Sequence, residues 1–84
     1  RGAGSLLVRG EIGAAIAMLQ RARQSDARYA PTYRSLGLAY TRARHFDESR
    51  AAYEQYLRLA PGASDADQIR ARIRALDEPT PTEP

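Results

Sequence analysis

The chain has 84 residues, of which 43% are apolar and 27% charged, a composition typical of a small folded domain. It contains no cysteine, which excludes a disulfide framework, and no apolar run approaches the roughly 20 residues of a membrane-spanning helix. The net charge is +3 and all 13 basic residues are arginines, a bias typical of GC-rich genomes, so charge alone does not identify a partner.

Residues 1–29 are expected to form a truncated helical hairpin. We predict a short helix over residues 2–9, a turn at Gly10, and then a second helix with small or apolar residues at helical spacing. These spaced residues are Ile12, Ala15, Leu19 and Ala22. Because the chain begins at Arg1 without a methionine, we also expect the natural protein to continue upstream.

Residues 30–63 form the clearest unit, for which we predict two antiparallel helices. Pro31 suits the first turn of a helix, where its missing N–H would be unpaired in any case. Asp47 is placed to cap the second helix, and Pro61 with Gly62 is placed to end it.

Close packing of these two helices is expected at Gly37, whose missing side chain lets them approach against Ser49. The second helix has one apolar face, because its apolar residues recur every three or four positions. They are Ala51, Tyr53, Tyr56, Leu57 and Ala60.

We predict a capping helix over residues 64–77 and a disordered tail over residues 78–84. Ser64 and Asp67 resemble a capping box at the start of this helix. A single apolar stripe leaves its other face for water, as a terminal element of a repeat stack requires. The stripe contains Ala66, Ile69, Ile73 and Leu76, and the arginines off it are Arg70, Arg72 and Arg74.

An internal repeat links the first two units. Residues separated by 34 positions match in type, and this period is typical of units made from two helices. The matched pairs are Leu6 with Tyr40, Ile12 with Phe46, Leu19 with Tyr53, Ala3 with Gly37 and Ala15 with Ser49.

Residues 30–61 resemble the tetratricopeptide repeat family. The residues that carry the resemblance are Tyr33, Leu36, Gly37, Tyr40, Phe46, Ser49, Tyr53 and Pro61. Two residues depart from the pattern: Arg44 stands where a turn glycine is usual, and Tyr56 stands where a small alanine is usual. The resemblance implies an all-α fold of antiparallel helical hairpins stacked as a right-handed solenoid, with the matched aromatic residues in the core.

The resemblance also implies a function, because the first helix of each hairpin in this family lines a concave groove that binds other proteins. The groove residues expected here are Leu7 and Val8 in the truncated unit, Arg34, Leu38, Thr41 and Arg42 in the complete unit, and Gln68 and Arg72 in the capping helix. Since arginine binds carboxylates well, the expected partner is a protein with an acidic or amphipathic segment.

Two other functions are open. Apolar residues of the first unit, among them Leu6, Ile12 and Ile16, could pair with a second copy and make the chain a self-assembly module. Nucleic-acid binding through the arginines is a weaker alternative, because it needs exposed aromatic residues beside them. The compartment is not specified by the sequence.

Nothing in the sequence predicts catalysis. His45 is the only histidine, and without cysteine or a second histidine it lacks the partners of a metal site. The acidic residues lie near expected helix starts or in the tail, where they compensate the helix dipole or aid solubility. We therefore expect no enzyme activity, no cofactor, no metal and no small-molecule substrate.

Overall fold

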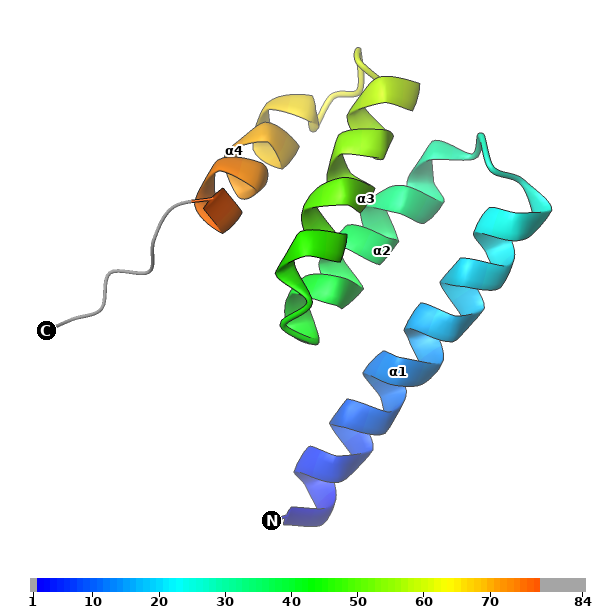
Figure 1. The fold of residues 1–84 in the computed structure, drawn as a ribbon, viewed down its shortest axis with the longest axis vertical. Helices are drawn as coiled ribbons and strands as arrows, with labels where there is room; N and C mark the ends of the chain where they lie inside the picture. The colour runs from blue at the N-terminus through cyan, green and yellow to red at the C-terminus, as the bar shows by residue number, and fades with distance from the viewer. Residues whose placement is uncertain (1, 78–84) are drawn as a thin grey trace, which may run out of the picture.

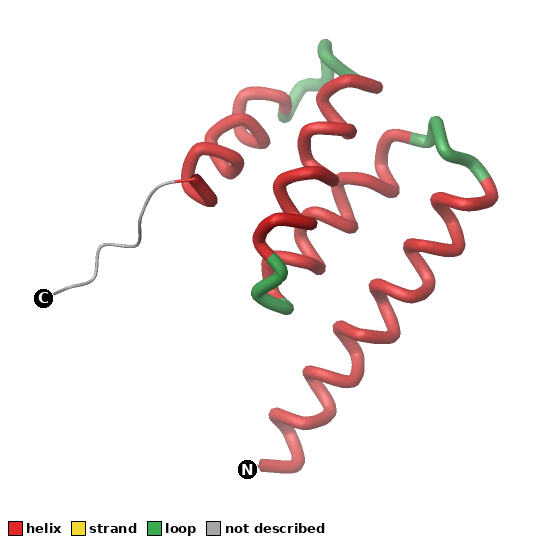
Figure 2. The backbone as a smooth tube through the Cα atoms, in the orientation of Figure 1, coloured by secondary structure: helices red, strands yellow, loops and turns green. Residues whose placement is uncertain are grey.

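The computed structural model describes the backbone of residues 2–77 and the side chains of residues 11–77. Four helices make up this part of the chain: α1 (Gly2–Ser25), α2 (Ala30–Arg42), α3 (Phe46–Leu59) and α4 (Ala66–Asp77) (Figure 1). Only helices and loops occur between residues 2 and 77, so the all-α prediction is confirmed (Figure 2). None of these four helices has an apolar stretch long enough to cross a membrane.

Each helix packs against the next one in the chain. Figure 1 shows α2 behind α3, with α1 and α4 on either side of this pair. Short loops join the helices, as is typical of antiparallel neighbours. The groove residues Leu7 and Val8 and the tail over 78–84 lie outside the part whose side chains are described.

The turn predicted at Gly10 is wrong, because α1 continues without a break from Gly2 to Ser25. A single glycine lowers helix stability by only about 1 kcal/mol, and no proline lies nearby to stop the helix. The predicted short helix over 2–9 is therefore the first part of one long helix.

The hairpin of α2 and α3 begins where it was predicted to begin, with Pro31 in the first turn of α2. Its central turn forms at Arg44, which has a positive φ of 64°. The His45 N–H donates to Tyr40 O at 2.8 Å and the Arg44 N–H donates to Thr41 O at 3.0 Å. These two bonds satisfy carbonyls at the end of α2 in a Schellman motif, in which the residue with positive φ is usually glycine.

Two predicted caps are wrong. His45, not Asp47, is the N-cap of α3, and Asp47 lies inside the first turn, where its charge still faces the positive end of the helix dipole. The fourth helix begins at Ala66, two residues later than predicted. The carboxylate of Asp67 accepts a hydrogen bond from Arg70 at 2.8 Å, which replaces the expected capping box.

The core lies between α2, α3 and α4. Its buried apolar residues are Tyr33, Leu36, Ala52, Tyr53, Tyr56 and Ile69. Tyr40 packs against this cluster from its edge, but Phe46 is 45% exposed, which contradicts its expected place in the core. Phe46 is the first residue of α3 and therefore stands at the edge of the hairpin.

The close approach expected at Gly37 is present. A Cβ atom on Gly37 would lie 2.8 Å from Cγ of Tyr53, so the Tyr53 ring fills the space of the missing side chain. Ser49 contributes in another way, because its hydroxyl donates a 2.7 Å hydrogen bond to Gly37 O. The two helices are thus held by ring packing and by a buried polar contact at the same glycine.

Candidate functional site

The outer face of α2 carries three of the predicted groove residues in one row. Arg34, Leu38 and Arg42 are spaced four residues apart, so they share one face of the helix. The opposite face, with Leu36 and Gly37, is buried against α3. The row is therefore the part of α2 that remains available to a partner.

A shallow hollow lies on one side of this row, between α2 and α4. It has a volume of about 20 Å³ and is lined by Arg34, Leu38, Tyr53, Ile69 and Arg72. Tyr53 and Ile69 are almost fully buried and form its floor, while the two arginines are exposed at its rim. The hollow is too small to enclose a side chain, but the guanidinium groups at its edge can bind a carboxylate that lies on this surface.

A larger groove of about 360 Å³ lies on the other side of the row, between α1 and α2. Five of its eight lining residues are apolar, with Leu38 again among them, and three are polar or charged. The lining residues are Glu11, Ile12, Ala15, Leu19, Ser35, Leu38, Ala39 and Arg42. Leu38 therefore borders both depressions and stands at the centre of the exposed face.

Arg34 is held in place by contacts with the loop between α3 and α4. Its Nε donates to Oδ2 of Asp65 at 2.6 Å, and the Tyr56 hydroxyl donates to Oδ1 of the same carboxylate at 2.7 Å. These three residues, which we call the Asp65 latch, join α2, α3 and the start of α4. Of the hydrogen bonds formed among residues 11–77, none uses the terminal nitrogens of Arg34, so their four N–H groups are not engaged by the described part of the chain.

The Asp65 latch changes the acidity of its members. The hydrogen bond from Tyr56, followed by the one from Arg34, holds the pKa of Asp65 below its ordinary value. The hydrogen bond to Asp65, together with burial, raises the pKa of Tyr56 above its ordinary value. Asp65 is therefore ionised and Tyr56 neutral at neutral pH.

Two of the predicted groove residues, Thr41 and Gln68, line neither depression. The Thr41 hydroxyl lies 2.8 Å from Gly37 O and 2.6 Å from the Ser49 hydroxyl, so it belongs to the contact between α2 and α3. Gln68 is exposed on α4 and lines neither hollow. Of the predicted groove residues, the structure thus gathers Arg34, Leu38, Arg42 and Arg72.

Sequence reasoning missed Ser35, Ala39 and the latch residue Asp65. Ser35 and Ala39 lie beside the row on α2. Ser35 is three residues before Leu38 and Ala39 is one residue after it, so helical spacing was sufficient to predict both. Asp65 is 31 residues from Arg34, and no local pattern connects residues so far apart.

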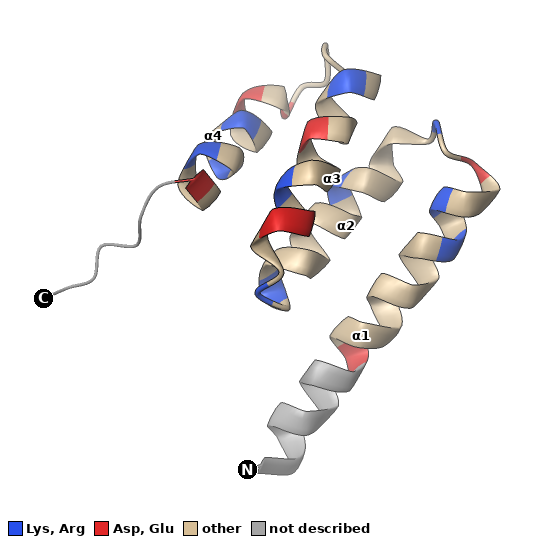
Figure 3. Cartoon of the chain, viewed as in Figure 1, with Lys and Arg blue, Asp and Glu red and all other residues tan. Residues whose placement is uncertain are grey.

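Three of the other arginines within residues 11–77 form ion pairs or hydrogen bonds through their side chains: Arg50, Arg58 and Arg70. Arg50 pairs with Asp77 at 2.9 Å and with Glu54 at 3.4 Å, and Arg70 pairs with Asp67 at 2.8 Å. Acidic residues lie between the arginines of α3, whereas in α4 the arginines are consecutive charges with an acidic residue near each end of the helix (Figure 3). Arg42 and Arg72 make no ion pair within residues 11–77, a property that they share with most of the arginines described, and they differ from the others in lying beside Leu38.

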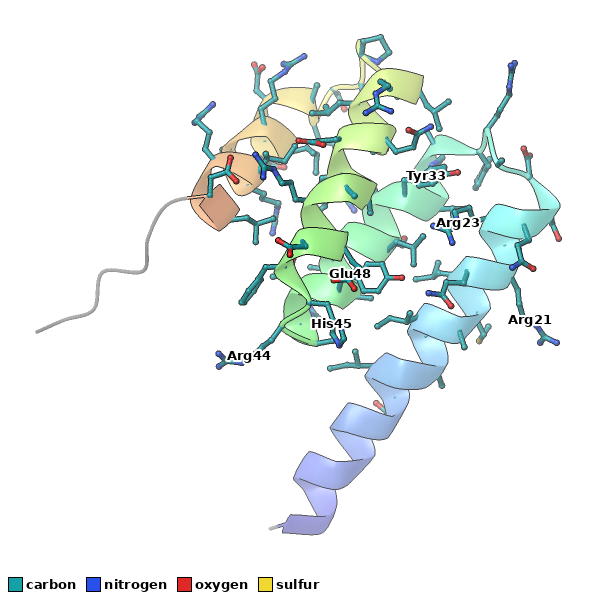
Figure 4. All side chains as sticks on the ribbon, viewed as in Figure 1. Arg21, Arg23, Tyr33, Arg44, His45 and Glu48 are labelled. Atoms are coloured by element: carbon teal, nitrogen blue, oxygen red, sulfur yellow. The ribbon has the colours of Figure 1, made fainter. Side chains whose placement is uncertain are left out.

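Another opening, of about 350 Å³, lies where α1, α2 and α3 meet. Arg23 of α1, Tyr33 of α2 and Glu48 of α3 are among its lining residues (Figure 4). His45 is nearby, with Nδ1 3.8 Å from Oε2 of Glu48. No group of three metal-ligating side chains occurs within residues 11–77.

Comparison of the chain with protein-family models, with curated proteins and with solved structures gave no match. The function is therefore inferred from the surfaces of the molecule itself.

Proposed function

We propose that the chain is a protein-interaction module of the tetratricopeptide type, without catalytic activity, which holds a segment of a partner protein on the outer face of α2. In this proposal α2 and α3 form one complete helical hairpin of a right-handed solenoid, and α4 is its cap. The internal period of 34 residues and the Gly37–Tyr53 contact support this assignment.

The observation that carries the proposal is the row Arg34, Leu38 and Arg42 with Arg72 beside it. An apolar residue at its centre can bury a partner's apolar side chain, which is the usual origin of affinity in protein interfaces. The surrounding arginines add specificity for carboxylates, because a guanidinium can donate two parallel hydrogen bonds. Arg34 is oriented in advance by Asp65, so less side-chain freedom is lost when a partner binds.

The chemistry of this face selects one class of partner: an extended or helical segment with an apolar residue flanked by aspartate or glutamate. Nucleic acid fits less well, because acidic residues lie between the arginines of α3 and at both ends of α4, and no row of exposed aromatic residues accompanies the arginines within the described part. Tyr29 and Phe46 are exposed, but neither lines the two depressions beside α2.

Selection from a phage-displayed library of random peptides tests the proposal, because such a library needs no identified partner. The folded chain is immobilised, and each round is counter-selected on the Arg42→Glu/Arg72→Glu variant, so that only peptides using this face are kept. The proposal predicts enrichment of peptides with paired acidic and apolar residues. Enrichment of basic peptides, or of none that distinguish the two proteins, would contradict it.

A further inference from the structure

Asp65, which immediately precedes α4, ties the start of this helix to two others. Its backbone oxygen accepts a hydrogen bond from the Ile69 N–H at 3.0 Å, so Asp65 takes part in the first turn of α4. Its side chain accepts from the other two helices, at Oδ1 from the Tyr56 hydroxyl and at Oδ2 from Nε of Arg34. The position of α4 relative to α2 and α3 is therefore set at one carboxylate.

This arrangement is not a general requirement of the repeat. The residues one 34-residue period before Tyr56 and Asp65 are Ala22 and Pro31, which have neither a hydroxyl nor a carboxylate. The junction between α1 and α2 is thus built without such a latch, although these two helices also pack on each other. The Asp65 latch is peculiar to the junction beside the proposed partner site.

The two arginines that border the hollow between α2 and α4 both depend on this junction. Arg34 is bonded to Asp65 directly, through Nε at 2.6 Å. Arg72 follows Asp65 by seven residues, which is about 10 Å along a helix, so its place depends on where α4 starts. The latch therefore controls the spacing between the guanidinium groups of Arg34 and Arg72.

Tyr56 is the most buried member of the latch. It is 7% exposed and its ring belongs to the core, whereas the Arg34 side chain is 45% exposed. Because the core holds the ring, the hydroxyl is a fixed point from which Asp65 is held at 2.7 Å. We propose that Tyr56 is a positioning residue for the partner site, which it supports through Asp65 and Arg34. This inference rests on the proposed function and adds to it a residue that lies beneath the binding face.

The order of the Arg34 side chain tests this role without a partner. Tyr56→Phe keeps the ring in the core and removes only the hydroxyl. Relaxation of the Arg34 Nε–Hε group, measured by ¹⁵N NMR, should give an order parameter near that of a rigid backbone, about 0.85, in the unmodified chain. In Tyr56→Phe it should fall below about 0.6, the range of flexible groups. An Arg34 side chain that is equally ordered in both proteins would overturn the proposal.

Tyr33→Phe is the matched control. The Tyr33 hydroxyl also donates at 2.7 Å from a residue that is 7% exposed, but its acceptor is Ala27 O in the loop between α1 and α2. Each variant thus loses one hydrogen bond of the same kind, and a general loss of stability would affect both. Only Tyr56→Phe should release the Arg34 side chain.

Peptide binding gives the second readout. For a peptide obtained from the phage-display selection, Tyr56→Phe should raise the Kd about threefold to tenfold, and Tyr33→Phe should change it less than about twofold. Tyr56→Phe should lose most of this effect when it is combined with Arg34→Ala, because the group that it positions is then absent. An undiminished effect in that background would show that Tyr56 does not act through Arg34.

The failure of this inference is distinguishable from the failure of the proposed function. If Arg42→Glu/Arg72→Glu leaves peptide binding unchanged, the partner site itself is wrong. If that variant weakens binding while Tyr56→Phe and Tyr33→Phe bind alike, the partner site stands and the positioning role of Tyr56 is overturned.

Discussion

The ring of Tyr53 on α3 lies directly against the backbone of Gly37 on α2 and occupies the volume that a side chain at this position would need. Both residues belong to the resemblance noted in the sequence, and both are buried. The contact sets the distance between the two helices and thereby the position of the outer face of α2. The stability of the hairpin and the geometry of the proposed binding face therefore depend on the same contact.

Replacement of Gly37 by alanine should destabilise the fold. The added methyl overlaps the Tyr53 ring, and relief of such overpacking costs about 1–3 kcal/mol in the free energy of unfolding. Urea denaturation followed by circular dichroism measures this change. The matched control is Gly13→Ala on α1, where no atom lies within 4 Å of the new Cβ, and there the higher helix propensity of alanine should stabilise by up to about 1 kcal/mol. Equal stability of the two variants would disprove the role of the contact.

Replacement of Arg44 by glycine should stabilise the fold. Arg44 has a φ of 64°, and this left-handed conformation is unfavourable for a residue with a Cβ by about 1–2 kcal/mol relative to glycine. A gain of about 1 kcal/mol raises the melting temperature by roughly 4–8 °C in a domain of this size. Arg44→Ala is the control, because it removes the charge but keeps the Cβ, and it should give no comparable gain. A melting temperature that does not rise in Arg44→Gly would show that the turn is not strained.

Replacement of Asp65 by asparagine should lower stability near neutral pH and have little effect in acid. The pKa of Asp65 in the folded state lies below its unfolded value of about 3.9, so its contribution is complete above that pH. The contribution is lost as the pH falls through the folded pKa, where the carboxylate becomes protonated. Thermal melts of both proteins at neutral and strongly acidic pH give the difference. A gap in melting temperature that stays constant between the two conditions would contradict the Asp65 latch.

Replacement of Tyr33 by phenylalanine should cost about 1 kcal/mol, the net value of one hydrogen bond in a folded protein. The Tyr33 hydroxyl donates to Ala27 O at 2.7 Å and so fixes the loop between α1 and α2. Tyr29→Phe is the control, since Tyr29 is 57% exposed in the same loop and its hydroxyl makes no hydrogen bond within the described residues. In chemical denaturation, Tyr33→Phe should unfold at a lower denaturant concentration than Tyr29→Phe. Indistinguishable curves would mean that the loop does not depend on this bond.

The second hairpin was predictable because its signals are local. Pro31 marks the start of α2, Pro61 follows the end of α3, and Gly37 marks the close approach of the two helices. The continuity of α1 was not predictable, because Gly10 matches a turn position but the choice between turn and helix depends on what packs beside it. At the equivalent position in the next unit, Arg44, a turn does form, although a positive φ is unfavourable for arginine.

Half of the candidate site followed from helical spacing. Arg34, Leu38 and Arg42 share a face whatever the tertiary structure, so their row could be read from the sequence. The orientation of the Thr41 side chain could not be read from the sequence, because it depends on the hydroxyl of Ser49 on another helix. The restraint of Arg34 by Asp65 likewise depends on how α4 packs, which no local sequence signal determines.

The most direct test of the proposed function compares two variants of equal charge. Arg42→Glu/Arg72→Glu reverses two charges beside Leu38, and Arg21→Glu/Arg58→Glu reverses two elsewhere. Arg21 points away from the body of the molecule, and within the described residues Arg58 bonds only to Gln55 on its own helix (Figure 4). Both pairs of substitutions change the net charge equally, so only position distinguishes them.

The measurement is the Kd of a fluorescently labelled peptide, taken from the phage-display selection, for the unmodified chain and for both variants by fluorescence anisotropy. The proposal predicts that Arg42→Glu/Arg72→Glu weakens binding about tenfold or more, while Arg21→Glu/Arg58→Glu changes it by less than about threefold. Equal weakening by both variants would show that net charge, and not the outer face of α2, holds the peptide.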